Sequence, residues 1–161
     1  MPPKLSAGLL LYRRSNRDDE ALLEVLLGHM GGPFWSRKDE AAWSIPKGEY
    51  GPDEDPFAAA KREFEEELGS APPEADYREL GSISQPGGKL VTVWASEADF
   101  DAAAAVSNTF EIEWPPRSGH LQAFPEIDRA GWFSTEVARS RLVKGQRPLI
   151  DRLEAMLGTP R

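Results

Sequence analysis

The chain has 161 residues, 40% hydrophobic and 29% charged, as expected for one globular domain spanning residues 1–161. The absence of cysteine excludes a disulfide framework, a thiolate metal site and a cysteine nucleophile, and two histidines are too few for a multi-histidine metal site. A net charge of −8 without a basic cluster argues against a nucleic acid polymer as partner, whereas a bridging divalent cation lets an acidic protein bind small phosphate compounds.

The first predicted elements are the two strands of a hairpin. Short apolar runs at residues 8–12 and 22–27 flank a polar loop at residues 15–19. The apolar stretch that begins at residue 7 is too short for the core of an export signal or for a bilayer span. We therefore expect a cytoplasmic protein that does not associate with membranes.

The middle of the chain contains the clearest helix. It follows a Gly- and Pro-rich break at residues 31–35, a short strand around Trp43 and a loop at residues 48–53. Asp55 is a suitable N-cap, Pro56 suits the first helical position and Gly69 suits a left-handed stop. The apolar stripe of this helix at residues 55–68 consists of Phe57, Ala60, Phe64 and Leu68.

Further strands and two helices follow. Residues 77–83 and 90–95 flank a turn, and strands are expected at residues 110–114 and 130–133. Ser134 can cap a helix that ends near residue 142, and the last helix spans residues 148–157. Strands outnumber helices without regular alternation, which predicts an α/β (α+β) fold class with a mixed sheet clasped by two or three helices.

The helix at residues 55–68 carries an acidic face. Glu63, Glu66 and Glu67 fall within an arc of roughly 100° beside the apolar stripe. Like charges at this spacing repel one another, and a cation among them removes that cost. Oxygen ligands without histidine or cysteine favour Mg²⁺ or Mn²⁺ over zinc. A solvated acidic face explains the same spacing equally well.

The residues around this face favour the metal interpretation. Gly48 and Gly51 let the backbone approach the helix closely enough for a main-chain carbonyl to complete a cation shell. Arg62 stands next to Glu63 and can fix the orientation of its carboxylate, and Glu54 can balance Arg62.

These residues resemble the signature of the Nudix hydrolase family. The signature is Gly, five residues, Glu, seven residues, then Arg-Glu-hydrophobic-any-Glu-Glu-any-Gly-hydrophobic, and it matches from Gly48 to Ser70. Ser70 alone departs, standing where an apolar residue is usual. The resemblance implies an α/β/α sandwich around a mixed sheet. It also implies a metal-dependent pyrophosphohydrolase in which water attacks one phosphorus of a nucleoside-diphosphate-linked compound.

The resemblance also implies roles for the matched positions. Glu63 would orient or deprotonate the attacking water, Arg62 would position Glu63, and Glu54 would support Arg62 or the metal shell. The Mg²⁺ or Mn²⁺ cofactors would be bound by Gly48, Glu63, Glu66 and Glu67.

Residues outside the matched signature extend the resemblance. Many members place a further acidic residue on a later loop, and Glu126 is our candidate for it, with Asp128 next. Lys47 directly precedes the signature and is expected to contact a substrate phosphate. Both settings resemble the dinucleoside polyphosphate hydrolase branch, so the substrate is expected to be a dinucleoside polyphosphate or a nucleoside triphosphate. Nucleotide sugars and inositol pyrophosphates stay open as alternatives.

Several other residues are weaker candidates for contacts with the substrate. Lys89 and Arg117 are loop cations that can contact phosphate, and Trp35 can stack on a base, although surface solubility and aromatic packing explain them equally well. His29 and His120 are assigned no catalytic role.

Two other functions are compatible with the sequence. A nucleotide-binding or regulatory module on the same fold would bind without turnover, and calorimetry without product formation would identify it. An interaction protein with a solvated helix face would show no change in thermal stability with divalent cations. Folds of this kind often pair through exposed strands, so a homodimer is an alternative to a monomer.

Overall fold

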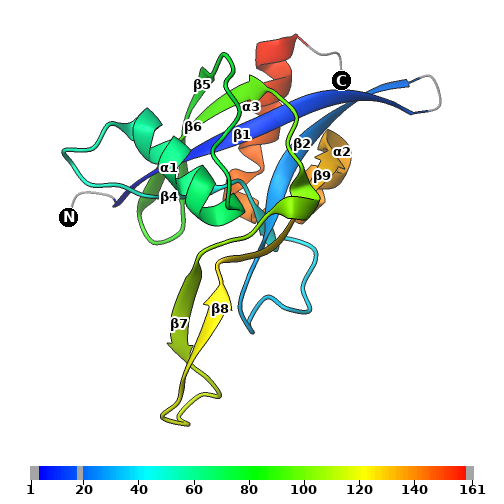
Figure 1. Ribbon diagram of the computed structural model, residues 1–161. Helices are drawn as coiled ribbons and strands as arrows, with labels where there is room; N and C mark the ends of the chain where they lie inside the picture. Colours follow the sequence, from blue (N-terminus) through cyan, green and yellow to red (C-terminus); the bar gives the residue numbers. More distant parts are fainter. Residues whose placement is uncertain (1–3, 18–19, 159–161) are drawn as a thin grey trace.

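The computed structural model describes residues 4–17 and 20–158 (Figure 1). Its centre is a mixed seven-stranded sheet in which β1 is parallel to β6 and antiparallel to β2 and β4. The order β3-β2-β1-β6-β5 forms the main path, and β9 pairs with β2 off that path. The strands of this sheet are β1 (Lys4–Arg17), β2 (Glu20–Met30), β3 (Trp43–Ser44), β4 (Lys47–Glu49), β5 (Arg78–Gln85), β6 (Lys89–Glu97) and β9 (Ile127–Ser134).

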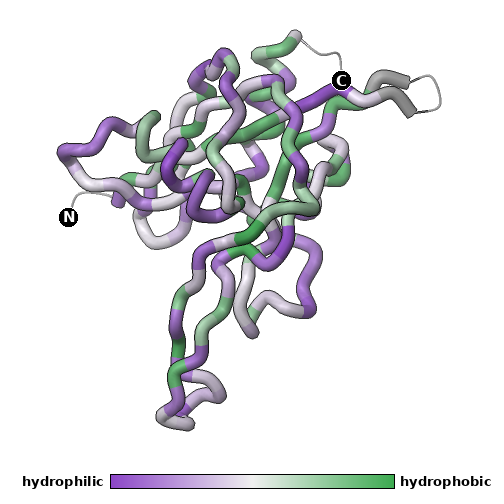
Figure 2. Tube along the Cα trace, in the orientation of Figure 1, coloured by the Kyte–Doolittle hydropathy of each residue, from purple (hydrophilic) through white to green (hydrophobic). Residues whose placement is uncertain are grey.

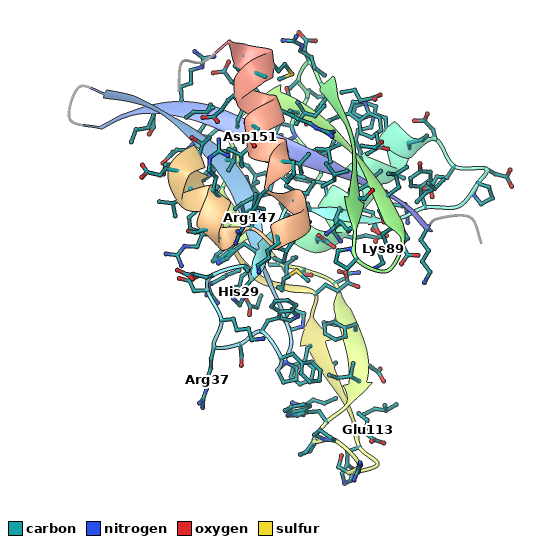
Figure 3. The ribbon with its side chains drawn as sticks, turned by 180° about the vertical axis from the view of Figure 1, so that it is seen from behind. His29, Arg37, Lys89, Glu113, Arg147 and Asp151 are labelled. Carbon is teal, nitrogen blue, oxygen red and sulfur yellow. The ribbon has the colours of Figure 1, made fainter. Side chains whose placement is uncertain are left out.

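Helices cover both faces of the sheet. Figure 1 views it from the side of α1 (Pro56–Leu68), and Figure 3 views it from the side of α2 (Thr135–Arg141) and α3 (Pro148–Leu157). Successive side chains of a strand point to opposite faces. On β1, Leu9 and Leu11 therefore belong to the core under α1, whereas Leu10 belongs to the core under α2 and α3. This arrangement confirms the α/β/α sandwich.

The central helix has the caps that its sequence predicts. Asp55 accepts a hydrogen bond from the Ala58 amide at 2.9 Å, and Pro56 opens the helix. Gly69 ends it with φ of 83°, a left-handed conformation that glycine adopts without steric cost. Phe64 is fully buried against the sheet. The helix prediction is confirmed, and its register sets where the acidic face points.

Three loop predictions were wrong in part. β1 continues to Arg17 and β2 begins at Glu20, so the predicted loop at residues 15–19 is mostly strand, with residues 18–19 outside the described part. Gly48 and Glu49 belong to β4 because they pair with Ala7 and Ser6 on β1. The expected loop around Glu126 is one residue between a strand at Leu121–Pro125 (β8) and β9. Local composition does not reveal β4 and the start of β9, because these strands pair with the distant strands β1 and β2. The ends of β1 and β2 instead pair with each other within their hairpin.

A two-stranded arm projects from the body of the molecule. It consists of β7 (Thr109–Glu113) and β8 (Leu121–Pro125), paired antiparallel apart from the main sheet (Figure 1). Figure 2 shows apolar and polar residues alternating along the arm, as the predicted half-buried strand at residues 110–114 required. Two short 3₁₀ turns, Ala102–Ala104 and Lys144–Gln146 (η2), complete the elements. Within the described residues, every helix is too short or too polar to span a bilayer.

Candidate functional site

A cleft of about 470 Å³ opens where the sheet forks. The N-terminal part of β1 pairs with β4, whereas β2 pairs with β9 and β3 at its C-terminal end. The cleft between these two branches is lined by residues from both and by the acidic face of α1. Its titratable side chains are Lys47, Glu49, Glu63, Glu67, Lys89 and Glu126.

Two carboxylates of α1 are partly or fully removed from water in this cleft. Glu67 is 8% exposed, and its Oε1 accepts a hydrogen bond from the Lys47 amide at 3.2 Å. Burial raises the pKa of Glu67 to about 8. Burial also raises the pKa of Glu63 to about 7, together with the contact to Glu66, to which the protonated Glu63 carboxyl can donate. Glu126 adds repulsion that raises the pKa of both. The cleft therefore concentrates carboxyl groups whose raised pKa values the charges of Arg62 and Lys47 offset only in part.

Gly48 lies directly against Glu63. A Cβ on Gly48 would lie 1.8 Å from Oε1 of Glu63, so only glycine leaves room for that carboxylate. The pairing of Gly48 with Ala7 on β1 fixes this position. The main chain at Gly48 and the carboxylate of Glu63 are consequently adjacent, as the metal interpretation requires.

Arg62 is held by an ion-pair network beside the cleft. Its Nε lies 3.0 Å from Oε2 of Glu54 and its Nη1 lies 3.8 Å from Oε1 of Glu66. The hydrogen bonds of its guanidinium go to Glu54 and to the Glu49 carbonyl. Arg62 acts on Glu63 through charge alone, and its charge lowers the pKa of that carboxyl against the larger effect of burial.

Main-chain hydrogen bonds place Glu126 opposite α1. The Asn108 amide donates to the Glu66 carbonyl, the Glu126 amide donates to the Asn108 carbonyl, and the Gly31 amide donates to the Glu126 carbonyl. These three bonds, of 2.8 to 3.0 Å, run from the last turn of α1 across Glu126 to the end of β2. Ser107 Oγ also accepts from the Ile127 amide at 3.1 Å. The role of residues 107–108 had no recognisable signal in the sequence.

Asp128, the second candidate for the acidic loop residue, is bound to a histidine instead. His29 is fully buried, and its Nδ1 lies 2.9 Å from Oδ1 of Asp128 while its Nε2 lies 2.6 Å from the Lys38 carbonyl oxygen. The Lys38 carbonyl can only accept, so Nε2 of His29 donates to it, and Nδ1 makes the contact with Asp128. His29, labelled in Figure 3, thereby ties β2 to the start of β9 and to the loop that follows β2.

Replacing His29 with alanine is expected to lower the free energy of unfolding by about 2–4 kcal/mol, because it leaves a cavity and removes the hydrogen-bond partners of Asp128 and of the Lys38 carbonyl. Urea denaturation measures this change. His120→Ala, at an exposed position on the arm, is the matched control and should change stability by less than about 0.5 kcal/mol. Equal stabilities of the two variants would contradict the assigned role of His29.

The weaker candidates separate into two groups. Lys47, Lys89 and Trp35 line the cleft. Arg117 lies in the turn between the strands of the arm, where its amide donates to Glu113. Glu113 is exposed far from the body of the molecule (Figure 3).

The donors in the cleft suit a hard divalent cation. In residues 4–17 and 20–158, no three carboxylate or imidazole side chains are close enough to enclose a cation in the arrangement observed. The carboxyl groups of Glu63 and Glu67 nevertheless have raised pKa values and are repelled by Glu126. A bound cation would offset both this repulsion and the cost of ionising buried carboxyl groups. Gly48 adds a main-chain approach without steric obstruction.

These pKa shifts predict how stability depends on pH. The ordinary pKa of both groups is 4.5, so above that value the unfolded chain releases protons that the folded protein retains. Without metal, stability should therefore fall by on the order of 1–2 kcal/mol between pH ~5 and pH ~8. Urea unfolding in EDTA measures this fall. Mg²⁺ should reduce it by favouring the ionised carboxylates, and identical slopes with EDTA and Mg²⁺ would contradict the prediction.

Comparisons with known proteins identify relatives of this fold. The family model described as NUDIX domain matches residues 2–153, whereas no curated protein matches the chain. A mutT/nudix family protein from Listeria innocua has 15% identity and a TM-score of 0.65, over 98% of this chain and 96% of that one. The NUDIX domain of Shewanella oneidensis NrtR, complexed with ADP ribose, has 17% identity and a TM-score of 0.65, over 98% and 90%. An Ap4A hydrolase from C. elegans has 22% identity and a TM-score of 0.61, over 96% and 98%.

Proposed function

The chain belongs to the Nudix hydrolase family, whose members act on phosphorus-containing anhydrides, and we propose that it is a divalent-cation-dependent pyrophosphohydrolase of small nucleotide compounds. The single observation that carries the proposal is the convergence of Glu63, Glu67 and Glu126 with two lysines in one cleft. Carboxylates alone would repel a diphosphate. The same carboxylates with bound Mg²⁺ or Mn²⁺ would attract it.

The residues of the signature would have separate roles in the reaction. Glu63, Glu66 and Glu67, assisted by the Gly48 carbonyl, would hold the cations, which when bound would offset charge on the phosphate oxygens and on the leaving group. Arg62, held in place by its ion pair with Glu54, would provide positive charge beside Glu63.

The reaction is a hydrolysis of one P–O–P linkage. The water oxygen forms a new bond to phosphorus, the bond from that phosphorus to the bridging oxygen breaks, and the bridging oxygen leaves with the other phosphate. Glu63 or Glu126 would orient the water and take its proton. The pKa of Glu63, raised to about 7 mainly by burial, suits a base near neutral pH. Lys47 would contact a phosphate of the substrate.

The substrate is proposed to be a dinucleoside polyphosphate or a nucleoside triphosphate. The structural likeness to an Ap4A hydrolase and to a domain complexed with ADP ribose supports a small nucleotide ligand. Lys47 and Lys89 in the cleft provide counterions for phosphates beyond those at the glutamates.

A substrate panel tests the proposal. Nucleoside triphosphates, dinucleoside polyphosphates and nucleotide sugars are incubated with Mg²⁺ or Mn²⁺ in oxygen-labelled water, and the labelled product identifies the phosphorus that is attacked. We expect turnover of at least one compound and none in EDTA. Tight binding by calorimetry with no product from any compound would instead identify a non-catalytic nucleotide-binding or regulatory module.

A further inference from the structure

The chain passes from one branch of the forked sheet to the other at Ile45 and Pro46, which we call the crossing. These two residues stand between β3, which pairs with β2, and β4, which pairs with β1. The crossing belongs to neither strand, so its backbone polar groups need hydrogen-bond partners outside the strand ladders. Ile45 is fully buried, where an unpaired backbone group is costly. The position of the crossing therefore depends on partners from elsewhere in the chain.

A buried glutamine of η2 provides the central part of these hydrogen bonds. Gln146 is fully buried, and Figure 3 labels the residue after it, Arg147. The Ile45 amide can only donate, so the atom of Gln146 that lies 2.9 Å from it is the oxygen Oε1. Nε2 of Gln146 then donates to the Ser44 hydroxyl at 2.8 Å, and this hydroxyl donates to the Ile45 carbonyl at 2.7 Å. One side chain thus completes a buried network around both polar groups of Ile45.

The opposite side of the crossing lies against β1. The Leu9 amide donates to the Pro46 carbonyl at 3.2 Å. A Cβ on Gly8 would lie 2.7 Å from that carbonyl oxygen and 2.9 Å from Cβ of Lys47, so glycine at this position allows the close approach. The crossing is therefore held between β1 on one side and Gln146 on the other.

Two contacts with the glutamates of α1 follow directly after the crossing. The Lys47 amide donates to Oε1 of Glu67 at 3.2 Å. The Gly48 main chain lies against the carboxylate of Glu63. A shift of the crossing would move both contacts, because the main chain connects them to it within three residues. Since Gln146 is fully buried, it reaches these contacts only through the main chain.

We propose that Gln146 is a positioning residue for the metal-binding carboxylates of α1. It fixes the crossing and thereby holds the Lys47 amide in reach of Glu67. The same anchor keeps the Gly48 main chain beside Glu63. This inference rests on the proposed function for the role of the two carboxylates, and it extends the site from α1 to η2. Loss of a group that orients metal ligands typically weakens metal binding by about ten- to a hundredfold.

Binding of Mn²⁺ alone tests this proposal, because electron paramagnetic resonance measures the free ion without turnover. Gln146→Met keeps the approximate length of the side chain and removes both of its hydrogen bonds. We expect this variant to bind Mn²⁺ about tenfold more weakly than the parent. Gln122→Met, the same change at an exposed position of the arm, is the matched control and should bind Mn²⁺ as the parent does.

Amide hydrogen exchange distinguishes positioning from a general loss of stability. In Gln146→Met, the Lys47 amide should exchange at least about tenfold faster relative to the amides of β1, because its bond to Glu67 is weakened. The kcat for hydrolysis per folded molecule should fall by about tenfold, with KM changed by less than about threefold. A general loss of stability would accelerate exchange throughout the protein and leave the Mn²⁺ affinity of the folded molecules unchanged.

The outcomes separate this role from the proposed function. A folded Gln146→Met variant with the Mn²⁺ affinity of the parent overturns the positioning role, while hydrolysis by the parent leaves the proposed function standing. Weaker Mn²⁺ binding by the variant, without hydrolysis of any nucleotide by the parent, supports the positioning role and contradicts the proposed function. A parent that binds no Mn²⁺ contradicts both.

If Gln146→Met does not fold, hydrogen exchange in the parent decides. The proposal requires slow exchange of the Ile45 amide, whose acceptor is the Gln146 side chain. Exchange at Ile45 as fast as at Gly87, in the exposed turn between β5 and β6, would overturn it.

Discussion

The Glu67→Gln variant should lose hydrolytic activity by about a hundredfold or more and yet unfold at higher urea concentration than the parent when metal is absent. The amide keeps the size of the side chain and still accepts the hydrogen bond that the Lys47 amide donates at 3.2 Å. It cannot carry the negative charge that burial disfavours so strongly that the pKa of Glu67 rises to about 8. A gain of about 1 kcal/mol at pH ~8 is expected for the metal-free protein.

Opposite changes in activity and stability distinguish a functional carboxylate from a structural one. Steady-state hydrolysis and urea unfolding in EDTA measure the two quantities. Mg²⁺ should raise the melting temperature of the parent and should raise that of Glu67→Gln much less. Glu65→Gln, at an exposed position of the same helix, is the control and should change neither quantity. A variant that is less stable in EDTA, or that keeps its activity, would show that Glu67 is held for packing.

The Gly48→Ala variant should lower activity by about ten- to a hundredfold with a loss of stability below about 1 kcal/mol. The new methyl group would occupy the position of the Glu63 carboxylate, since the distance to Oε1 is 1.8 Å. The atoms that must move are at the end of a flexible side chain, so the fold tolerates the change while the carboxylate leaves its place.

Gly51→Ala is the matched control for this variant. A Cβ at Gly51 meets nothing within 4 Å, although the two glycines are only three positions apart in the sequence. Hydrolysis rates and urea midpoints of both variants provide the comparison. If Gly48→Ala retained full activity, the proposed placement of Glu63 beside the main chain would be wrong.

The sequence predicted the helix and its acidic face because all the signals are local. Asp55, Pro56 and Gly69 act on their own neighbours, and the spacing of the glutamates follows from the helical repeat. It did not predict the strand identity of Gly48, which depends on a pairing with Ala7 from a distant segment. The mixed sheet followed from the count of strands, but its order did not.

The surroundings of Glu126 show most clearly what could not be predicted from the sequence. The sequence indicated an acidic residue on a loop, whereas the structure has one residue fixed at both its amide and its carbonyl. The hydrogen-bond partners of Glu126, Asn108 and Gly31, are 18 and 95 positions away in the sequence. His29 was assigned no role because a lone histidine has no pattern, and its contact with Asp128 exists only in three dimensions.

The hydrogen bond between Asn108 and Glu126 closes the base of the arm, because Thr109 and Pro125 are the first pair of β7 and β8. The chain thus departs and returns at neighbouring points. A hairpin joined in this way is a module: its length and tip can change through insertion or deletion without shifting Glu126 relative to α1. Only Phe110, near its base, reaches the cleft. Variation in the rest of this hairpin can therefore accumulate while the spacing of the carboxylates is preserved.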